Sequence, residues 1–105
     1  IGKGSNILVR DEGIKGVVLH VGEGLSSVKI EGDTIYAEAG ASMASVASAA
    51  LRESLTGMEF AHGIPGSIGG GVMMNAGAYG GEICMVCKTV DVMDLQGNIR
   101  ISMND

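Results

Sequence analysis

Apolar residues along the first 40 positions alternate with polar residues or form short runs between turn residues, a pattern that predicts strands. The predicted strands cover residues 7–9, 17–20 and 34–39, and residues 25–30 alternate more loosely. Glu31-Gly32-Asp33 lies between two of these segments and has the Gly and Asp of a hairpin turn.

A change of period after residue 42 predicts a helix. Between Met43 and Leu51 the apolar residues recur at i, i+3, i+4, i+7 and i+8, which is one face of a helix. Ser42 is a suitable N-cap. We expect the helix to stop near Ser54, with Gly57 available as its C-terminal turn residue.

The last part of the chain returns to a strand pattern. Residues 86–95 are strand-like, Gln96-Gly97-Asn98 predicts a second hairpin turn, and residues 99–103 alternate cleanly. A second, short helix is predicted to start near Pro65. Because the strands are not separated by regular helices, the sequence predicts an α+β fold with a mostly antiparallel sheet and flanking helices, rather than a doubly wound parallel sheet.

The composition fits one domain with a moderate core, since the chain has 105 residues and is 46% hydrophobic. Aromatic residues make up only 3%, so the core must be built from aliphatic residues, Met and Ala. The same scarcity suggests either a partial unit or a domain that contacts its ligand mainly through backbone. Met73 and Met74 are expected to pack the short helix onto the core.

The net charge of −5 argues against binding to nucleic acid or to an anionic membrane surface, since both depend on Lys and Arg. No run approaches the roughly 18 to 20 apolar residues of a membrane span. The sequence opens on a glycine-rich turn and not on a signal peptide. We therefore expect a cytoplasmic protein.

The first glycine motif is Gly2-Lys3-Gly4-Ser5-Asn6. It is not a mononucleotide P-loop, because Gly4 stands where Ser or Thr must follow the lysine, and it lacks the third glycine of the dinucleotide fingerprint. Its run of amides with small side chains can form a concave site for an anion such as a pyrophosphate. A plain turn is the alternative.

The second glycine motif runs from Gly63 to Gly71, and a third cluster follows from Asn75 to Gly81. Pro65 suits the first turn of a helix, and the small residues after it would leave the first-turn amides open to an anion. The alternative is that the glycines let this helix pack closely on a neighbour. The third cluster favours a ligand, because it follows within one short helix.

Other residue types give no catalytic or metal site. Cys84 and Cys87 form a C-x-x-C pair, but no second pair completes a zinc site. On a strand these two side chains would point to opposite faces, which favours two ordinary reduced cysteines. His20 is expected to be structural, and His62 is a candidate ligand contact beside the glycines. No pair of carboxylates suggests an acid–base dyad.

Three segments together resemble the family of UDP-N-acetylenolpyruvoylglucosamine reductases, also called UDP-N-acetylmuramate dehydrogenases. They are GKGSNILVRDEGIKGVVL from residue 2, EAGASMASVASAAL from residue 38 and GMEFAHGIPGSIGGGVMMNAGAYGGEI from residue 57. The resemblance covers nearly the whole chain. The wider superfamily includes vanillyl-alcohol oxidase and p-cresol methylhydroxylase, and residues 1–105 would be a single subdomain, similar to the second FAD-binding subdomain of those enzymes.

The resemblance implies non-covalent FAD, NADPH as the reductant, and reduction of UDP-N-acetylglucosamine enolpyruvate to UDP-N-acetylmuramate for peptidoglycan. The first glycine turn would lie at the FAD pyrophosphate, the second at another part of the cofactor, and the third near the flavin ring and its substrate face. The cofactor-binding residues implied in this way are Gly2, Gly4, Ser5, Asn6, Ile7, Leu8, Gly63, Ile64, Pro65, Gly66, Ser67, Gly69, Gly70, Asn75, Gly77, Ala78, Tyr79 and Gly80.

The departures from the family pattern are as informative as the matches. The chain is much shorter than the family's enzyme, and the family's leading FAD subdomain, its C-terminal substrate domain and its catalytic serine, arginine and glutamate have no counterparts here. We therefore expect a fragment that is inactive, that would meet the UDP-sugar only through the missing domain, and that self-associates through its exposed surface. Two alternatives remain: a non-catalytic nucleotide- or anion-binding module, and an FAD-dependent oxidase of the same superfamily with another substrate.

Overall fold

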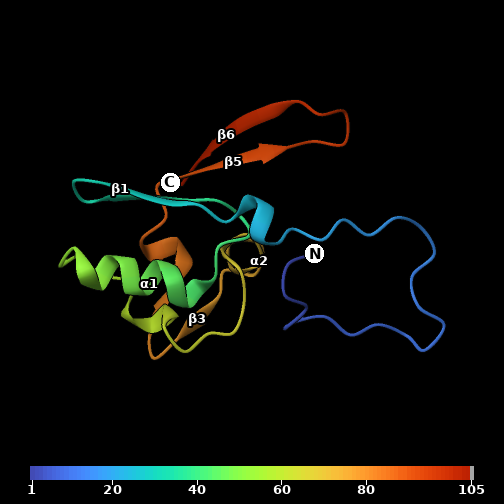
Figure 1. Ribbon diagram of the computed structural model, residues 1–105, viewed down its shortest axis with the longest axis horizontal. Coiled ribbons are helices and arrows are strands. Elements are labelled where there is room, and N and C mark those ends of the chain that lie inside the picture. The colour runs from blue at the N-terminus through green and yellow to red at the C-terminus, as the bar shows by residue number, and fades with distance from the viewer. Residues whose placement is uncertain (105) are drawn as a thin grey trace.

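The computed structural model describes residues 1–104, which form two α-helices, three short 3-10 helices and three antiparallel hairpins (Figure 1). This is the α+β composition that the sequence predicts. The expected single sheet is wrong, however, because each pair of strands forms a separate two-stranded sheet. The 3-10 helices are η1 (Glu23–Leu25), η2 (Glu59–Ala61) and η3 (Ile83–Met85).

The first hairpin joins β1 (Val28–Glu31) and β2 (Thr34–Ala37), as predicted. Glu31 pairs with Thr34, so the turn consists of two residues, and Gly32 takes a φ of 60° that favours glycine. Both strands contact the first helix, and Figure 1 shows the hairpin lying along that helix. The hairpin therefore covers the packed part of the molecule.

Helix α1 (Met43–Arg52) confirms the predicted period and the predicted N-cap. The Ser42 hydroxyl accepts a hydrogen bond from the Ser45 amide at 3.0 Å. At the other end the expected role of Gly57 is wrong. Ser54 takes the left-handed conformation (φ 57°) directly after the cap, and the Leu55 amide donates to the Ala50 carbonyl at 2.8 Å, which is the Schellman arrangement.

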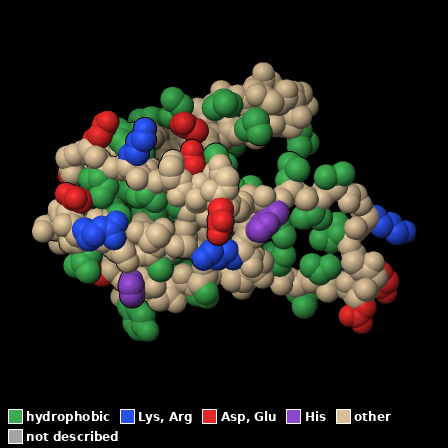
Figure 2. All heavy atoms as spheres, in the orientation of Figure 1, with side chains coloured by type: hydrophobic (Ala, Val, Ile, Leu, Met, Phe, Trp, Pro, Cys, Tyr) green, Lys and Arg blue, Asp and Glu red, His purple; other side chains and the backbone are tan. Residues whose placement is uncertain are grey.

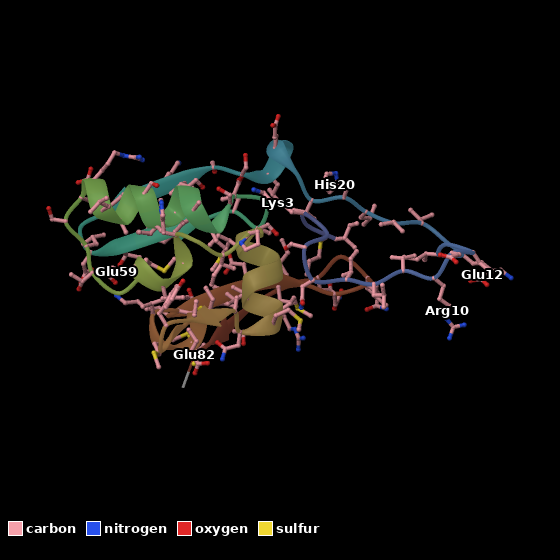
Figure 3. All side chains as sticks on the ribbon, turned by 90° about the horizontal axis from the view of Figure 1, so that it is seen from below. Lys3, Arg10, Glu12, His20, Glu59 and Glu82 are labelled. Atoms are coloured by element: carbon pink, nitrogen blue, oxygen red, sulfur yellow. The ribbon has the colours of Figure 1, made fainter. Side chains whose placement is uncertain are left out.

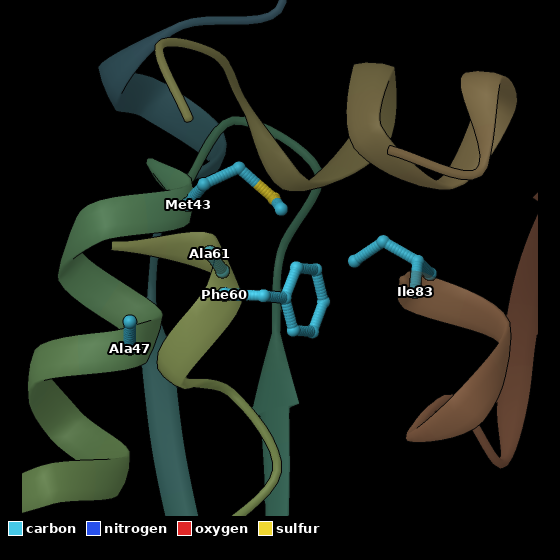
Figure 4. Close-up of a cluster of buried hydrophobic side chains, with 5 residues drawn as sticks. All are labelled: Met43, Ala47, Phe60, Ala61 and Ile83. Atoms are coloured by element: carbon cyan, nitrogen blue, oxygen red, sulfur yellow. The ribbon is translucent and has the colours of Figure 1, made fainter. Parts of the chain in front are cut away.

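The core lies between α1, η2 and η3 (Figure 4). Met43 has no exposed surface, and the Phe60 ring lies between α1 and Ile83. Small alanines on α1 and η2 allow these elements to approach one another. The five buried side chains of this cluster are Met43, Ala47, Phe60, Ala61 and Ile83.

Helix α2 (Ile68–Met74) starts later than predicted, with Ser67 as its N-cap and Pro65 outside it. Its start decides which residues face the core. Ile68 and Val72, one turn apart, pack against the core cluster. The predicted packing of the two methionines is wrong, because they lie on the other side of the helix, where Met73 is 84% exposed.

The N-terminal arm, residues 1–22, extends away from the packed body (Figure 1). The strands predicted at residues 7–9 and 17–20 are wrong, because these segments pair with no other strand of the described chain. Instead the arm turns back on itself, and the Val21 amide donates to the Ile1 carbonyl at 2.8 Å. Leu8 is fully exposed, and Figure 2 shows hydrophobic side chains along the whole arm.

The last hairpin joins β5 (Thr89–Met93) and β6 (Ile99–Met103) around the predicted turn. The Asp94 carboxylate accepts hydrogen bonds from the Gln96 and Asn98 amides, both at 2.9 Å. The hydrogen bonds from Asn98 are the main cause that lowers the pKa of Asp94 below its ordinary value. Little of this hairpin is buried, so it depends on the pairing of its two strands and on the hydrogen bonds of its turn.

Within the described residues 1–104, no helix is long and apolar enough to cross a membrane. Within residues 1–104, no three His, Cys, Asp or Glu side chains lie close enough to hold a metal ion.

Candidate functional site

The start of α2 is tied to the start of α1. The Ile68 amide donates to the Ala41 carbonyl and the Gly69 amide to the Ala39 carbonyl, both at 2.8 Å. In return, the Met43 amide donates to the Gly66 carbonyl at 3.0 Å. The prediction that Gly69 would offer an open amide is therefore wrong, because a neighbouring loop already uses that donor.

The glycines of α2 allow this close packing. A Cβ placed on Gly69 would lie 2.9 Å from the Ala39 Cβ, and one on Gly71 would lie 2.9 Å from the Met43 Sδ. Both distances are shorter than side-chain carbons adopt, so larger residues would push the helix outward. The packing interpretation of the second glycine motif is correct for these two positions.

The first and second glycine motifs meet in space, although about sixty residues separate them in the sequence. A Cβ on Gly2 would overlap the Oγ of Ser67, which is 3% exposed. A Cβ on Gly66 would lie 3.3 Å from the Ser5 Oγ. The two turns are thus in contact through positions where glycine leaves room.

Several amides remain open where these turns meet. The amides of residues 3–6 donate to no acceptor within residues 1–104, and the same is true of Gly63, Gly66 and Ser67. Gly4 takes a φ of 73°, which turns the first motif sharply. Lys3 brings a positive charge to the base of the arm (Figure 3). Open amides beside a lysine suit an anionic group.

The remaining predicted residues of these two motifs have different surroundings. Ile7 and Leu8 are exposed on the arm. Ile64 is partly buried against the core cluster, whereas Pro65 is exposed. The Gly70 amide makes only a long hydrogen bond, 3.4 Å, to the Ser67 Oγ, so it is the least committed donor of the first turn of α2.

The third glycine cluster begins at Asn75, which ends α2 in the left-handed conformation (φ 47°). Its side chain is already in use: Oδ1 accepts from the Cys84 amide at 2.9 Å, and Nδ2 donates to the Glu82 carboxylate at 3.0 Å. Sequence analysis missed this network. An Asn after a short helix signals the cap, but nothing local signals its partners.

A short hairpin follows, made of β3 (Gly77–Ala78) and β4 (Gly81–Glu82). Its turn residues Tyr79 and Gly80 both have positive φ, 52° and 82°, as in a type I′ turn. The Tyr79 side chain is 97% exposed. Ala78 in the same hairpin is partly buried. Tyr79 is therefore the residue of this hairpin that presents an aromatic ring to the surroundings.

The two histidines, His20 and His62, are both exposed. The expected structural role of His20 is therefore not supported by burial. His62 lies at the end of η2, directly before the second glycine motif.

The two cysteines follow the third glycine cluster in the sequence, and the Cys84 amide donates to Asn75 of that cluster. Both are free, and both line a hollow of about 230 Å³ between α2, η3 and the β5–β6 hairpin. The Cys84 thiol donates to the Glu82 carboxylate at 3.3 Å, and this hydrogen bond is the main cause that raises the pKa of the thiol. The assumed strand geometry of this pair is wrong, since Cys84 lies in η3.

Comparison with known proteins identifies what the glycine turns belong to. The chain is similar to UDP-N-acetylenolpyruvoylglucosamine reductases: 56% identical to that of Syntrophomonas wolfei over 98 residues and 55% identical to that of Lactococcus lactis subsp. cremoris over 101 residues. These matches cover 93% and 96% of the chain but only 33% of each relative. The reductase of Clostridium novyi is 54% identical over 94% of the chain.

The chain thus spans about a third of the length of these relatives. Residues 1–102, which include all three glycine motifs, match the family described as FAD binding domain. The chain therefore belongs to the FAD-binding domain family.

Proposed function

We propose that the chain is the FAD-binding part of a UDP-N-acetylenolpyruvoylglucosamine reductase. The observation that carries the proposal is the contact between the first and second glycine motifs, in a chain of the FAD-binding domain family. The names of the similar proteins favour this reductase over an oxidase of the same superfamily and over a module without catalysis.

The residues present fit a cofactor with a pyrophosphate. Gly2 and Gly66 make room for the Ser67 and Ser5 side chains, so the two turns lie together, and the amides of residues 3–6 and of Gly66 have no acceptor in the described chain. Such amides donate hydrogen bonds to phosphate oxygens, and Lys3 adds charge neutralisation. The net charge of the chain is −5, so an attraction for an anion must come from a local arrangement such as this one.

When bound, FAD would supply the hydride-carrying ring for reducing the enolpyruvyl group of the UDP-sugar. This chain's own contribution would be to hold and orient the cofactor. The first two motifs would donate amides to its phosphates, and Tyr79, exposed at the tip of its hairpin, would lie against the cofactor's ring system. Asn75 would act indirectly, by fixing the start of that hairpin.

Four further details of the proposal are inferred from the activity of the relatives and from the family resemblance. They are NADPH as the reductant, a UDP-sugar substrate, a cytoplasmic location and a fold like the second FAD-binding subdomain of vanillyl-alcohol oxidase. Because the chain spans a third of the relatives, we expect it to bind cofactor without completing the reaction.

The test is a titration of the protein with FAD, which follows flavin fluorescence and the melting temperature together. We expect saturable quenching and a higher melting temperature. Gly66→Val places bulk against Ser5 and should raise the Kd at least about tenfold. Gly24→Val is the matched control, since a Cβ there meets no atom within 4 Å.

A charge variant gives an independent comparison. Asn6→Asp adds a carboxylate beside the open amides and should weaken binding. Gln96→Glu adds the same charge on the β5–β6 turn, which lies outside the glycine motifs, and should leave the Kd unchanged. Equal effects of the two variants would contradict the proposed site. Quenching that appears only when flanking sequence encoded by the gene is added would show that these turns alone do not suffice.

A further inference from the structure

The C-x-x-C pair of Cys84 and Cys87 has no part in the proposed cofactor site. Both thiols line the hollow between α2, η3 and the β5–β6 hairpin, together with Val72, Ile83 and Val90. The argument for inert cysteines assumed a strand, in which the two side chains point to opposite faces. In the structure Cys84 lies in η3 instead, and Cys87 follows two residues after the end of η3, where its amide still donates to the Ile83 carbonyl.

The backbone of this turn fixes how the two residues face each other. The Ile83 carbonyl accepts hydrogen bonds from the Val86 amide at 3.1 Å and from the Cys87 amide at 3.0 Å. Residues three apart on such a turn lie on the same side, with Cβ atoms about 5–6 Å apart. A disulfide needs a Cβ separation of about 3.5–4.5 Å, so a small adjustment of the turn closes it.

One side chain holds both cysteine backbones in register. The Asn104 Nδ2 donates to the Cys84 carbonyl and to the Cys87 carbonyl, each at 2.7 Å. On the other side, the Asn75 Oδ1 accepts from the Cys84 amide at 2.9 Å. The spacing of the pair is therefore held by contacts from two other elements and not only by the sequence separation.

The thiols themselves are free to react. Cys84 is exposed and Cys87 is half-buried. Each makes one weak hydrogen bond, Cys84 to the Glu82 carboxylate at 3.3 Å and Cys87 to the Thr89 carbonyl at 3.8 Å. Met85 between them is 65% exposed, whereas Ile83 and Cys87 pack in or against the core cluster, so an adjustment of the turn would fall mainly on Cys84 and Met85.

We propose that Cys84 and Cys87 form a reversible dithiol–disulfide site, whose oxidant is a small organic disulfide such as glutathione disulfide. The exposed Cys84 thiolate attacks the small disulfide, forms a mixed disulfide and releases one thiolate. The Cys87 thiolate then attacks the Cys84 sulfur and releases the second. Two protein thiols and one small disulfide give one internal disulfide and two small thiols. The dithiol chemistry does not depend on whether the chain binds FAD.

Closing this disulfide would change the η3 turn, and Cys84 in that turn is hydrogen-bonded to both ends of the hairpin in the third glycine cluster. Asn75 and Glu82 are bonded to each other, and each is bonded to Cys84. Oxidation removes the thiol hydrogen that Glu82 accepts. The hairpin between Asn75 and Glu82 would therefore sense the redox state of the pair.

The test equilibrates the protein with mixtures of reduced and oxidised glutathione, then quenches with acid, labels free thiols with N-ethylmaleimide and measures the intact mass. The equilibration is done at mildly alkaline pH, because the hydrogen bond to Glu82 raises the pKa of Cys84. Since the chain has two cysteines, the internal disulfide appears as the loss of two hydrogens and the absence of label. The same equilibration in concentrated urea gives the equilibrium constant of the internal disulfide in a flexible C-x-x-C segment.

We expect the equilibrium constant for the internal disulfide to be about tenfold larger in the folded protein than in urea. Cys84→Ser and Cys87→Ser should each stop at a mixed disulfide with glutathione. An equal or smaller constant in the folded protein would overturn the proposal, as would accumulation of wild-type protein with one or two glutathione adducts and no internal bond. Either result would show that the turn does not bring the thiols together.

Discussion

The N-terminal arm and the segment from Ala41 to Ile83 show opposite relations between composition and burial. The arm is rich in large aliphatic residues, yet Leu8 is 100% exposed and Val17 is 90% exposed. The segment from Ala41 to Ile83 is dominated by Ala, Gly and Ser, yet it contains all the buried residues of the chain's described part. Hydropathy alone would have assigned the core to the wrong region.

The difference teaches that burial depends on available partners more than on residue size. Small residues let α1, η2 and α2 approach closely, so a few larger side chains such as Met43 and Phe60 can fill the remaining space. The arm contacts the body at its first glycine turn, but its apolar segments pair with no strand of the described chain. An extended segment without a partner remains exposed, whatever its hydropathy.

The strongest test of this comparison removes the largest fully buried side chain of the packed segment. Met43→Ala deletes a fully buried side chain and should lower the free energy of unfolding by about 3 kcal/mol, because it loses apolar burial and leaves a cavity. Met73→Ala is the control, since Met73 is 84% exposed, and should change the value by less than about 0.5 kcal/mol. Urea unfolding measures both. Similar losses in the two variants would contradict the assigned core.

A second test adds one carbon where the backbone is closest. A Cβ on Gly40 would overlap the carbonyl oxygens of Gly22 and Leu25, so Gly40→Ala should lower the free energy of unfolding by about 2 kcal/mol. Gly24→Ala is the control, because Gly24 lies in η1 beside Leu25 and a Cβ there meets nothing within 4 Å. It should be within about 0.5 kcal/mol of wild type. Thermal and urea unfolding should both show that Gly40→Ala is the more destabilising of the two variants.

A third test concerns the start of α1. Ser42→Ala removes the hydroxyl that accepts the Ser45 amide and should lower the free energy of unfolding by about 1 kcal/mol. Ser48→Ala, in the interior of the same helix, should be neutral or slightly stabilising, since Ala has the higher helix propensity. If Ser48→Ala proved the more harmful change, the cap would not be what starts the helix.

A fourth test uses the β5–β6 hairpin, which is as exposed as the arm but does form strands. The lowered pKa of Asp94 means that its stabilisation of the turn is present above the pKa of the unfolded chain. It is lost as the pH falls through the lower pKa of the folded state. NMR should show the Gln96 and Asn98 amide shifts changing in acid with a midpoint below that of an ordinary Asp. Asp94→Ala should remove this transition, and a midpoint at or above the ordinary value would contradict the turn network.

The smallest effect on stability is expected in the arm. Leu8→Ser combined with Leu19→Ser should change the free energy of unfolding by less than about 0.5 kcal/mol, because both side chains are exposed. The same double variant should reduce self-association, measured by sedimentation velocity, because it removes exposed apolar surface. A loss above about 1 kcal/mol would mean that the arm packs on the body.

Local sequence signals determined much of this protein. The period from Met43, the Ser42 cap and the two hairpin turns around Gly32 and Gly97 gave elements that the structure confirms. The glycine motifs pointed to the FAD-binding family, which the family match confirms. These features are local because capping, turn formation and periodicity involve residues within a few positions of one another.

Tertiary structure alone decided which apolar segments are buried, which amides remain open and where the cysteines face. Gly69 looked like an open donor but bonds to Ala39, and Met74 looked like core but is exposed, because α2 begins at Ile68 and docks on the start of α1. The contact between the first and second glycine motifs joins residues about sixty positions apart. Such contacts depend on how the elements pack, which no short stretch of sequence encodes.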